Sequence, residues 1–416
     1  MKTPVYDKET MAPQLMAGDV TTPTGFTANG VHCGIRKNKT KRDLALIMAD
    51  RPCSAAAMYT ENRVKSAPIY VTMENLRNKT ARAILVNSGN ANACAPSGRK
   101  AAEQSIAAAA NATGLQPTDF IVNSTGVIGQ PLPVDAIVSG IPALVAGLST
   151  EGGAAAADAI MTTDTFSKTA AVQIVLDGKT VTLGGIAKGS GMINPNLATM
   201  LAYITTDCAI EPNQLREALL YATKRSFNRI CVDGDTSTND MVAILANGAA
   251  GNNEIASKSF AFTAFKEALR VLCLALAKDI ARDGEGATKF ITCRVNQAPS
   301  PRGAVALAKS VVSSSLVKAA MFGADANWGR VMCALGNTSV SFNPDTVSVA
   351  FSSEAGHVVV GTEGKGIPFD ETQAKAVLSQ RDILIEVDMN HGKSAAEAYG
   401  CDLTYDYVKI NGDYRT

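Results

Sequence analysis

Short apolar segments that end in polar loops alternate with amphipathic segments along the chain. LALIMA, within residues 43–57, and ARAILV, at 81–86, predict short buried strands. Residues 99–113 are rich in alanine, begin with charged positions and stop before a glycine, as expected of a capped helix. Apolar and polar residues alternate over 170–186 around Gly178, which predicts a hairpin.

The second half of the chain shows the same alternation. Residues 201–207, LAYITTD, predict a strand, and residues 214–225 and 259–283 predict helices. The second helix has an apolar stripe that we interpret as core packing, formed by Phe262, Phe265, Leu269, Leu272 and Leu276. For residues 382–410 we expect a strand, a polar loop, a short helix or turn, and a final strand. Because strands and helices interleave and no dinucleotide-binding fingerprint follows a strand, we expect a layered α/β sandwich.

Composition argues against several classes of partner. The 416 residues allow one large or two medium domains, and 39 basic against 38 acidic residues give no field that would attract nucleic acid or an anionic membrane. Nine cysteines are scattered without a CxxC pair and suggest neither a zinc site nor a disulfide framework. The first residues lack the apolar core of a signal peptide, and the longest dense apolar run, 271–277, is too short to span a bilayer. We therefore expect a soluble cytoplasmic protein without metal, nucleic-acid or membrane partners.

One segment near the middle of the chain has the pattern of a self-cleaving precursor. Residues 188–201, KGSGMINPNLATML, place Thr199 behind the small residue Ala198, after a loop rich in glycine, proline and asparagine. A threonine hydroxyl is a poor nucleophile at neutral pH, and cutting the preceding peptide bond turns its own α-amino group into a neighbouring base. Such an amine titrates at about 7.7–8.0, so roughly a tenth of it is unprotonated at pH 7, far more than for an ordinary lysine.

Seven further blocks accompany this segment along the chain. They are NSGNANAC at 87–94, NSTG at 123–126, MTTDTF at 161–166, DGDTSTND at 233–240, DGEGATK at 283–289, GADANWGR at 323–330 and NGDYRT at 411–416. Together the eight blocks resemble the ornithine acetyltransferase family of arginine biosynthesis from end to end, and the series is far more specific than any single block. The resemblance implies an αββα-type sandwich with a smaller C-terminal α/β region. It also implies cleavage into fragments 1–198 and 199–416, which share one core and assemble as a heterotetramer with two copies of each.

The same resemblance assigns the catalytic groups. The hydroxyl of Thr199 would attack the carbonyl of Ala198 in an N-to-O acyl shift, and hydrolysis of that ester would free the amine. The hydroxyl would then accept the acetyl group. Thr125 and Gly126 are implied to stabilise the oxyanion, a role worth ~3 kcal/mol for each hydrogen-bond donor. On local sequence alone, these two residues could also be a simple turn after a strand at 120–122.

Substrate binding is assigned to Thr199 itself and to five further residues: Thr162, Lys188, Glu285, Asn411 and Thr416. Lys188 suits the α-carboxylate that donor and acceptor share, and Glu285 suits the side-chain ammonium of ornithine. The alternative interpretation of Lys188 and of Glu285 is a solvated charge in a loop. For Thr162 the alternative is a hydroxyl that hydrogen-bonds to the backbone of its own loop. Glutamate carries a carboxylate where ornithine carries its ammonium, so Glu285 must be protonated, turned away or bridged by another group. We expect the terminal hexapeptide to fold over the site, although such a segment would ordinarily be frayed.

The remaining candidates are interpreted as structural. The three histidines, His32, His357 and His391, lie far apart without metal-ligand spacing. The acidic loop residues Asp233, Asp235 and Asp240 lack the spacing and the final glutamate of a calcium loop, which favours turn and cap roles. Asn327 and Trp328 match the family, but no catalytic task follows from their chemistry.

Three functions compete. The leading hypothesis is a ping-pong transfer in which N-acetylornithine acetylates Thr199, ornithine leaves and glutamate collects the acetyl group; it needs no cofactor, and some members of the family also accept acetyl-CoA as donor. The second is a self-processed aminopeptidase or amidohydrolase, which would use the same acyl-enzyme without depending on an acceptor. The third is a non-enzymatic ligand-binding protein, which failure to self-cleave would favour.

Overall fold

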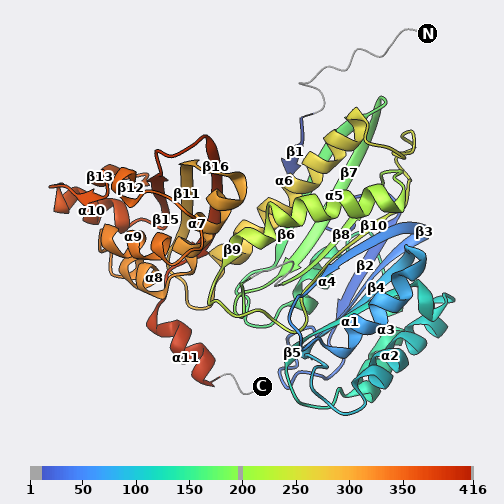
Figure 1. Ribbon diagram of the computed structural model, residues 1–416. Helices are drawn as coiled ribbons and strands as arrows, with labels where there is room; N and C mark the ends of the chain where they lie inside the picture. Colours follow the sequence, from blue (N-terminus) through green and yellow to red (C-terminus); the bar gives the residue numbers. More distant parts are fainter. Residues whose placement is uncertain (1–11, 195–199, 414–416) are drawn as a thin grey trace, which may run out of the picture.

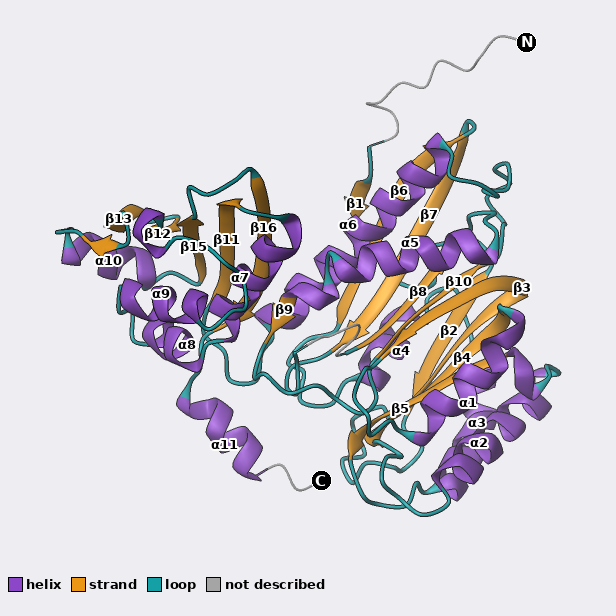
Figure 2. Ribbon diagram, in the orientation of Figure 1, coloured by secondary structure: helices purple, strands orange, loops and turns teal. Residues whose placement is uncertain are grey.

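The computed structural model describes residues 12–194 and 200–413, in which helices cover two sheets (Figures 1 and 2). The first sheet contains β1 (Gln14–Met16), β2 (Phe26–Val31), β3 (Leu44–Tyr59), β4 (Thr80–Asn90), β5 (Phe120–Val127), β6 (Lys168–Leu176), β7 (Lys179–Lys188), β8 (Leu201–Thr206) and β10 (Met241–Ala246). Its helices are α1 (Ala67–Asn75), α2 (Gly98–Thr113), α3 (Val134–Ala146), α4 (Gly153–Ile160), α5 (Pro212–Lys224) and α6 (Phe260–Arg282). Short 3-10 turns are η1 (Leu76–Asn78), η2 (Pro117–Asp119) and η3 (Phe227–Arg229).

The first sheet folds over at its longest strand. Its order is β1-β6-β7-β8-β10-β3-β4-β5, with β2 also paired to β3. Residues 44–49 of β3 pair with β2 and residues 54–59 pair with β10, and the register with β4 shifts between Met48 and Cys53. Because such irregularities bend a strand, β3 can take part in two sheet layers.

Alternate side chains of these strands enter different cores. On β8, Leu201 and Tyr203 face the core between the two sheet layers, whereas Ala202 and Ile204 face the core under α5 and α6. Leu85 of β4 faces a third core, under α2 and α3. The layers therefore follow the order helix, sheet, sheet, helix, which confirms the expected αββα sandwich (Figure 1).

The C-terminal unit has its own sheet, in the order β14-β13-β12-β15-β11-β16-β9. Its elements are β9 (Ile230–Cys231), β11 (Phe290–Ala298), α7 (Pro301–Ser313), α8 (Ser315–Phe322), α9 (Trp328–Gly336), η4 (Pro344–Thr346), β12 (Ser348–Ser353), β13 (Gly356–Thr362), β14 (Lys365–Gly366), α10 (Glu371–Leu378), β15 (Asp382–Asp388), β16 (Ser394–Cys401) and α11 (Tyr405–Asp413). β9 comes from the chain between α5 and β10, and Phe290 and Tyr399 pack into the core under α6. The two units are thus joined by a strand and by shared apolar packing.

Most elements expected from the sequence are present. The hairpin forms as β6 and β7, the strand after the predicted cut forms as β8, and α2 ends at Gly114, whose φ of 71° is the left-handed cap conformation. α6 begins after Ser259, whose side chain accepts a hydrogen bond from the backbone N–H of Phe262. The five residues of its apolar stripe are all buried, which confirms their interpretation as core.

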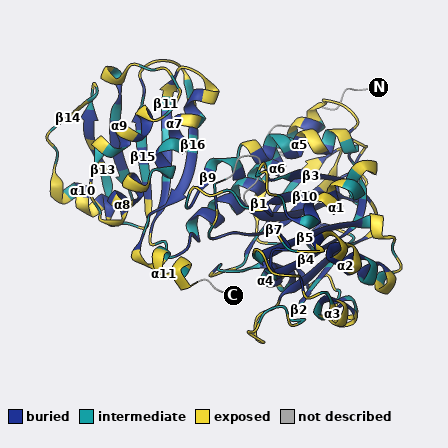
Figure 3. Ribbon diagram, turned by 60° about the horizontal axis from the view of Figure 1, so that its bottom comes forward, coloured by how far each residue is buried: buried dark blue, intermediate teal, exposed yellow. Residues whose placement is uncertain are grey.

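The expectation for the end of the chain is wrong. A strand, β16, directly follows the polar loop, and the expected final strand is the helix α11. The Thr404 hydroxyl accepts a hydrogen bond from the backbone N–H of Tyr407, as a helix cap does. None of the α11 residues is buried, and Figure 3 shows the helix largely exposed. Local capping therefore overrode the strand preference of its tyrosine, valine and isoleucine residues.

Within the described ranges, no single helix has both the length and the apolar composition needed to cross a membrane. The consecutive helices α7 and α8, which meet at a bend of 56°, satisfy those criteria only as a pair.

Candidate active site

One cavity of about 110 Å³ lies where the two units meet the end of the chain. Six predicted site residues line it: Thr125, Gly126, Thr162, Lys188, Glu285 and Asn411. The other three predicted residues, Ala198, Thr199 and Thr416, lie outside the described residues. The six come from five separate segments of the chain, so the fold brings together residues up to 286 positions apart.

Thr125 and Gly126 lie at the end of β5 rather than in a turn after it. They pair with Ser88 and Gly89 of β4, and the register then shifts at Asn90. Gly126 has a φ of 131°, and a Cβ added there would lie 2.3 Å from the carbonyl carbon of Gly89. Only glycine fits this crossing of two backbones, which exposes main chain at the cavity wall.

A loop that sequence reasoning had treated as structural completes this wall. Ser237, Thr238 and Asn239 line the cavity. The Asn239 side chain donates hydrogen bonds to the carbonyls of Ser124 (2.7 Å) and Ala91 (2.6 Å), and so fixes the loop to β5 and to the residue that follows β4. In the block DGDTSTND, it is the hydroxyl and amide side chains, and not the acids, that indicate this contact with the cavity.

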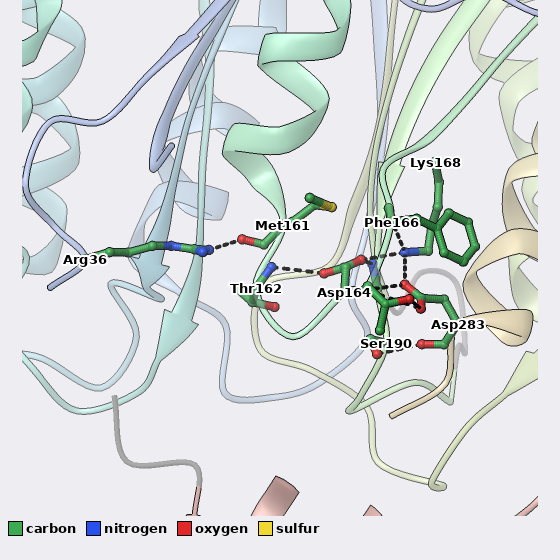
Figure 4. A network of polar contacts seen from close by, with 10 residues as sticks. Arg36, Met161, Thr162, Asp164, Phe166, Lys168, Ser190 and Asp283 are labelled. Atoms are coloured by element: carbon green, nitrogen blue, oxygen red, sulfur yellow. Dashed lines mark hydrogen bonds and ion pairs between the residues drawn. The ribbon is translucent and has the colours of Figure 1, made fainter. Parts of the chain in front are cut away.

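A fully buried ammonium group organises the opposite wall (Figure 4). Lys168 Nζ donates to Asp164 Oδ1 at 2.8 Å and to Asp283 Oδ2 at 2.6 Å, and its side chain is 0% exposed. Burial alone would raise the pKa of the Asp164 carboxyl, but the charges of Lys188 and Lys168 hold it well below its ordinary range. Asp164 is therefore ionised in the folded protein at neutral pH.

This network positions the segments that carry the site residues. Asp164 accepts hydrogen bonds from the backbone N–H groups of Thr162 (3.0 Å) and Gly189 (2.7 Å), which places Thr162 and the end of β7. The Ser190 hydroxyl donates to the carbonyl of Asp283 at 2.6 Å. Sequence reasoning missed the network because Asp164 and Asp283 are 119 positions apart, and nothing local shows that they meet.

Lys188 ends β7 and is only 8% exposed. Among the residues that the structure describes, no side chain or carbonyl forms a hydrogen bond or close ion pair with its ammonium group. Burial lowers the pKa of Lys188, while the negative charge of Asp164 opposes that effect. A buried cation that faces a cavity without a partner suits a ligand carboxylate.

Glu285 and Asn411 meet at the cavity. The Asn411 Nδ2 group donates to Glu285 Oε2 at 2.7 Å and also to the carbonyl of Tyr407 at 3.1 Å. The Glu285 carboxylate lies against Gly191, where an added Cβ would come within 2.2 Å of Oε2. The exposed end of α11 thus reaches the cavity and holds its acidic group in place.

Two further acids shape the loop around the cavity. Asp233 accepts hydrogen bonds from the backbone N–H groups of Met192 (2.5 Å) and Ile193 (2.9 Å), which confirms its structural role. Asp240 is buried, and burial raises the pKa of its carboxyl well above the ordinary value despite the nearby charge of Lys188. Burial therefore disfavours the charged form of Asp240, which lies near the cation of Lys188.

The described residues contain no group of three or more histidine, cysteine or acidic side chains that could hold a metal ion. None of the three histidines lines the cavity. Asn327, which had no derived task, caps α9 by accepting a hydrogen bond from the backbone N–H of Arg330.

Comparisons with known proteins agree along almost the whole chain. A family model, that of the ArgJ family, matches residues 27–416. The arginine biosynthesis bifunctional protein ArgJ of Symbiobacterium thermophilum is 51% identical over 403 residues, covering 96% of this chain and 99% of the relative. ArgJ of Geobacillus stearothermophilus is 48% identical over 401 residues, covering 96% of each chain. Among solved structures, ornithine acetyltransferase of Mycobacterium tuberculosis complexed with ornithine is 38% identical, with a TM-score of 0.42 and coverage of 45% of this chain and 100% of that chain.

Replacing Asp164 with asparagine tests the buried network. We expect Asp164→Asn to lower the free energy of unfolding at pH 7 by about 3 kcal/mol, because it leaves Lys168 buried with a single carboxylate. Asp158→Asn is the matched control, since its ion pair with Arg42 is exposed and should be worth less than about 1 kcal/mol. Urea unfolding measures both values, and equal losses in the two variants would contradict the role given to the network.

The pH dependence of the same experiment has a defined sign. The folded-state pKa of Asp164 is depressed, so its stabilisation is present above the unfolded-state pKa of about 3.9 and is lost as the pH falls through the folded-state pKa. The stability difference between the parent protein and Asp164→Asn should therefore narrow below about pH 4. A difference that stayed constant from pH 7 to about pH 3 would argue against an ionised, paired Asp164.

Proposed function

This chain belongs to the ArgJ family, and we propose that it transfers the acetyl group of N2-acetyl-L-ornithine to L-glutamate, giving L-ornithine and N-acetyl-L-glutamate. It is an acetyltransferase of arginine biosynthesis. One observation supports the assignment of acetyl transfer to this cavity. Six predicted residues from five segments line it, and they include one cation, Lys188, and one carboxylate, Glu285. Such a pair complements the opposite charges of an amino acid such as ornithine.

The nucleophile arises by self-cleavage. The Thr199 hydroxyl attacks the carbonyl carbon of Ala198, the peptide nitrogen leaves as the free amine of Thr199, and water hydrolyses the resulting ester. The sheet supports this position of the cut because it fixes the chain on both sides. Lys188 pairs with Leu201, and the backbone N–H of Met241 donates to the carbonyl of Met200 at 2.9 Å. The residue that follows Thr199 is thus anchored between two strands.

Acetyl transfer then proceeds in two steps. The α-amine of Thr199 takes the hydroxyl proton, the hydroxyl oxygen attacks the acetyl carbonyl of N-acetylornithine, and the proton passes to the ornithine nitrogen as its bond to the acetyl carbon breaks. The amine of glutamate next attacks the acetyl ester and restores the threonine hydroxyl. Thr125 and Gly126 stabilise the oxyanion of each tetrahedral intermediate. The constrained crossing of β4 and β5 supports this role, because it exposes backbone beside the Thr125 side chain.

The charges of the cavity support an assignment of the substrate groups. Lys188 binds the α-carboxylate that both substrates carry, and Glu285 binds the side-chain ammonium of ornithine. Thr162 adds a contact, and so do Asn411 and the terminal Thr416. The hydrogen bond from Asn411 and the packing against Gly191 argue against a Glu285 that turns away when glutamate binds. A group that bridges Glu285 and the side-chain carboxylate of glutamate therefore accounts for acceptor binding.

The two fragments stay together after the cut and form a heterotetramer with two copies of each. Strand order supports their association, because β8 lies between β7 and β10, and β10 is followed by β3. The sheet thus alternates between residues from before and after the cut. The reaction needs no cofactor. We place the enzyme in the cytoplasm, which nine free cysteines support.

Intact-mass analysis of the purified protein tests self-cleavage. The protein should give two fragments, residues 1–198 and 199–416, and Thr199→Ala should remain whole because it lacks the attacking hydroxyl. Thr263→Ala is the control; it removes an exposed threonine of α6 outside the proposed chemistry and should still cleave. Recovery of a fully active protein as one unbroken chain would contradict the mechanism.

Acceptor dependence separates transfer from hydrolysis. With N-acetylornithine as donor, ornithine release should rise on the order of a hundredfold when glutamate is added, because a bound and oriented amine outcompetes water. The formation of N-acetylglutamate and of free acetate is followed together by mass spectrometry. If acetate appeared equally fast with and without glutamate, the enzyme would instead be a hydrolase of the aminopeptidase or amidohydrolase type.

The contact between α11 and Glu285 predicts an effect on substrate affinity. Asn411→Ala should raise the KM for N-acetylornithine about fivefold to tenfold with a smaller change in kcat, because Glu285 loses the hydrogen bond that fixes it. Removal of residues 411–416 should have a larger effect. Lys409→Ala, an exposed change on the same helix, should leave KM unchanged. A truncated enzyme with unaltered substrate affinity would show that the C-terminus is not part of the site.

A further inference from the structure

A second, larger cavity lies on the seam between the two units. Its volume is about 530 Å³, and α5, η3 and α6 form one side while β11 and β16 form the other. Four arginines line it, Arg225, Arg229, Arg270 and Arg294, together with one acid, Glu397. In a chain whose net charge is only +1, this concentration of positive charge is unusual. The cavity, here called the arginine cleft, shares no residue with the proposed acetyl-transfer site.

Two of the four arginines are neutralised by neighbouring acids. Arg270 Nε donates to Glu267 at 2.6 Å, and Arg294 donates to Glu397 at 2.8 Å. These ion pairs hold both guanidinium groups in fixed positions on the walls of the cleft.

Arg225 is held without an acid. Its guanidinium carbon lies 3.8 Å from the centroid of the Tyr221 ring, which fixes the plane of the group by stacking. Its Nη1 group donates only to the carbonyl of Tyr221, at 3.5 Å, and no carboxylate of residues 12–194 or 200–413 forms an ion pair with it. The guanidinium is thus pre-oriented, with its charge uncompensated.

Arg229 is the least satisfied of the four. It is half-buried, its Nε group is buried without a hydrogen-bond partner, and no carboxylate in the part of the chain that the structure describes forms an ion pair with it. Burial lowers the pKa of Arg229, and the positive charges of Arg225 and Arg270 act in the same direction, whereas Tyr399 and Glu397 oppose them. A buried donor without a hydrogen-bond partner is unfavourable, and more so on a charged group, so an anion in the cleft would stabilise Arg229.

We propose that the arginine cleft is a binding site for a small multivalent oxyanion that bridges Arg225 and Arg229. Guanidinium groups bind phosphate and carboxylate oxygens in pairs, so a phosphate-bearing ligand and a polycarboxylate share the required chemistry. The cleft, at about 530 Å³, leaves room for such a group beside the arginines. The proposed acetyl-transfer cavity is smaller, about 110 Å³, and is lined by a different cation, Lys188. The site is independent of the residues proposed for acetyl transfer.

The test uses the purified, self-processed enzyme with two probes, pyrophosphate and citrate. Each is titrated by calorimetry at constant ionic strength, with sodium chloride as the reference, and each is also added in thermal unfolding experiments. We expect saturable binding of at least one probe with a rise in Tm. Arg229→Gln should weaken binding about tenfold, the loss expected for a charge-assisted hydrogen bond, and the double change Arg225→Gln with Arg229→Gln should abolish it.

Arg302→Gln is the matched control, because Arg302 is an exposed arginine of α7 outside the cleft; it should change the Kd less than about twofold. The Tm of each variant without ligand shows whether the fold is intact. Binding of pyrophosphate alone identifies phosphate as the recognised group, and binding of citrate alone identifies carboxylates. No saturation by either probe beyond the sodium chloride reference, or equal weakening by Arg302→Gln and Arg229→Gln, would overturn the proposal. Dissociation of the assembly by Arg229→Gln in sedimentation would also overturn it, because a partner chain would then cover the cleft.

Discussion

The cavity of the proposed acetyl-transfer site depends on one buried lysine held between two carboxylates. Asp164 and Asp283 come from different halves of the chain, and Lys168 binds both. Through Asp164 the network fixes Thr162 and the start of the loop after Lys188, and through Asp283 it fixes that loop again, next to Glu285. Burying three charges is costly, and apolar replacements often stabilise a fold more. The physical reason to keep such a network is that it specifies where three loops lie relative to one another.

Charge in the cavity is divided into groups that are already paired and groups that are not. Lys168 is neutralised within the protein, whereas Lys188 is buried nearby without an ion pair to any described residue. Burial raises the pKa of the nearby Asp240 carboxyl and so disfavours the charged form that would pair with Lys188. We infer that the charge of Lys188 is available to a substrate carboxylate and that Glu285, held by Asn411, provides the opposite charge. Two opposite charges in one cavity suit the two ends of an amino acid.

The local sequence was sufficient to predict elements that are determined by residues within the element itself. The glycine cap of α2, the hairpin around Gly178 and the apolar stripe of α6 each follow from residues within one element. α11 was mistaken for a strand because its tyrosine, valine and isoleucine residues favour strands locally, whereas none of them is buried in a core that would hold them as one. The site residues came from the family resemblance, and the fold brings together all six that are described. Asn239, Lys168 and Asp283 were missed because their importance depends on contacts between distant segments.

The strand order explains how a chain can be cut at its centre without losing its sheet. β7 and β8 are antiparallel neighbours whose pairing runs from Leu183 with Thr206 to Lys188 with Leu201, and β10 holds β8 on its other side. The pairs described for β7 and β8 all lie outside residues 195–199, so hydrolysis within that segment leaves these pairs in place. The pairing of β7, β8 and β10 is therefore compatible with the proposed cut, whose chemistry requires the alignment of one hydroxyl with one carbonyl.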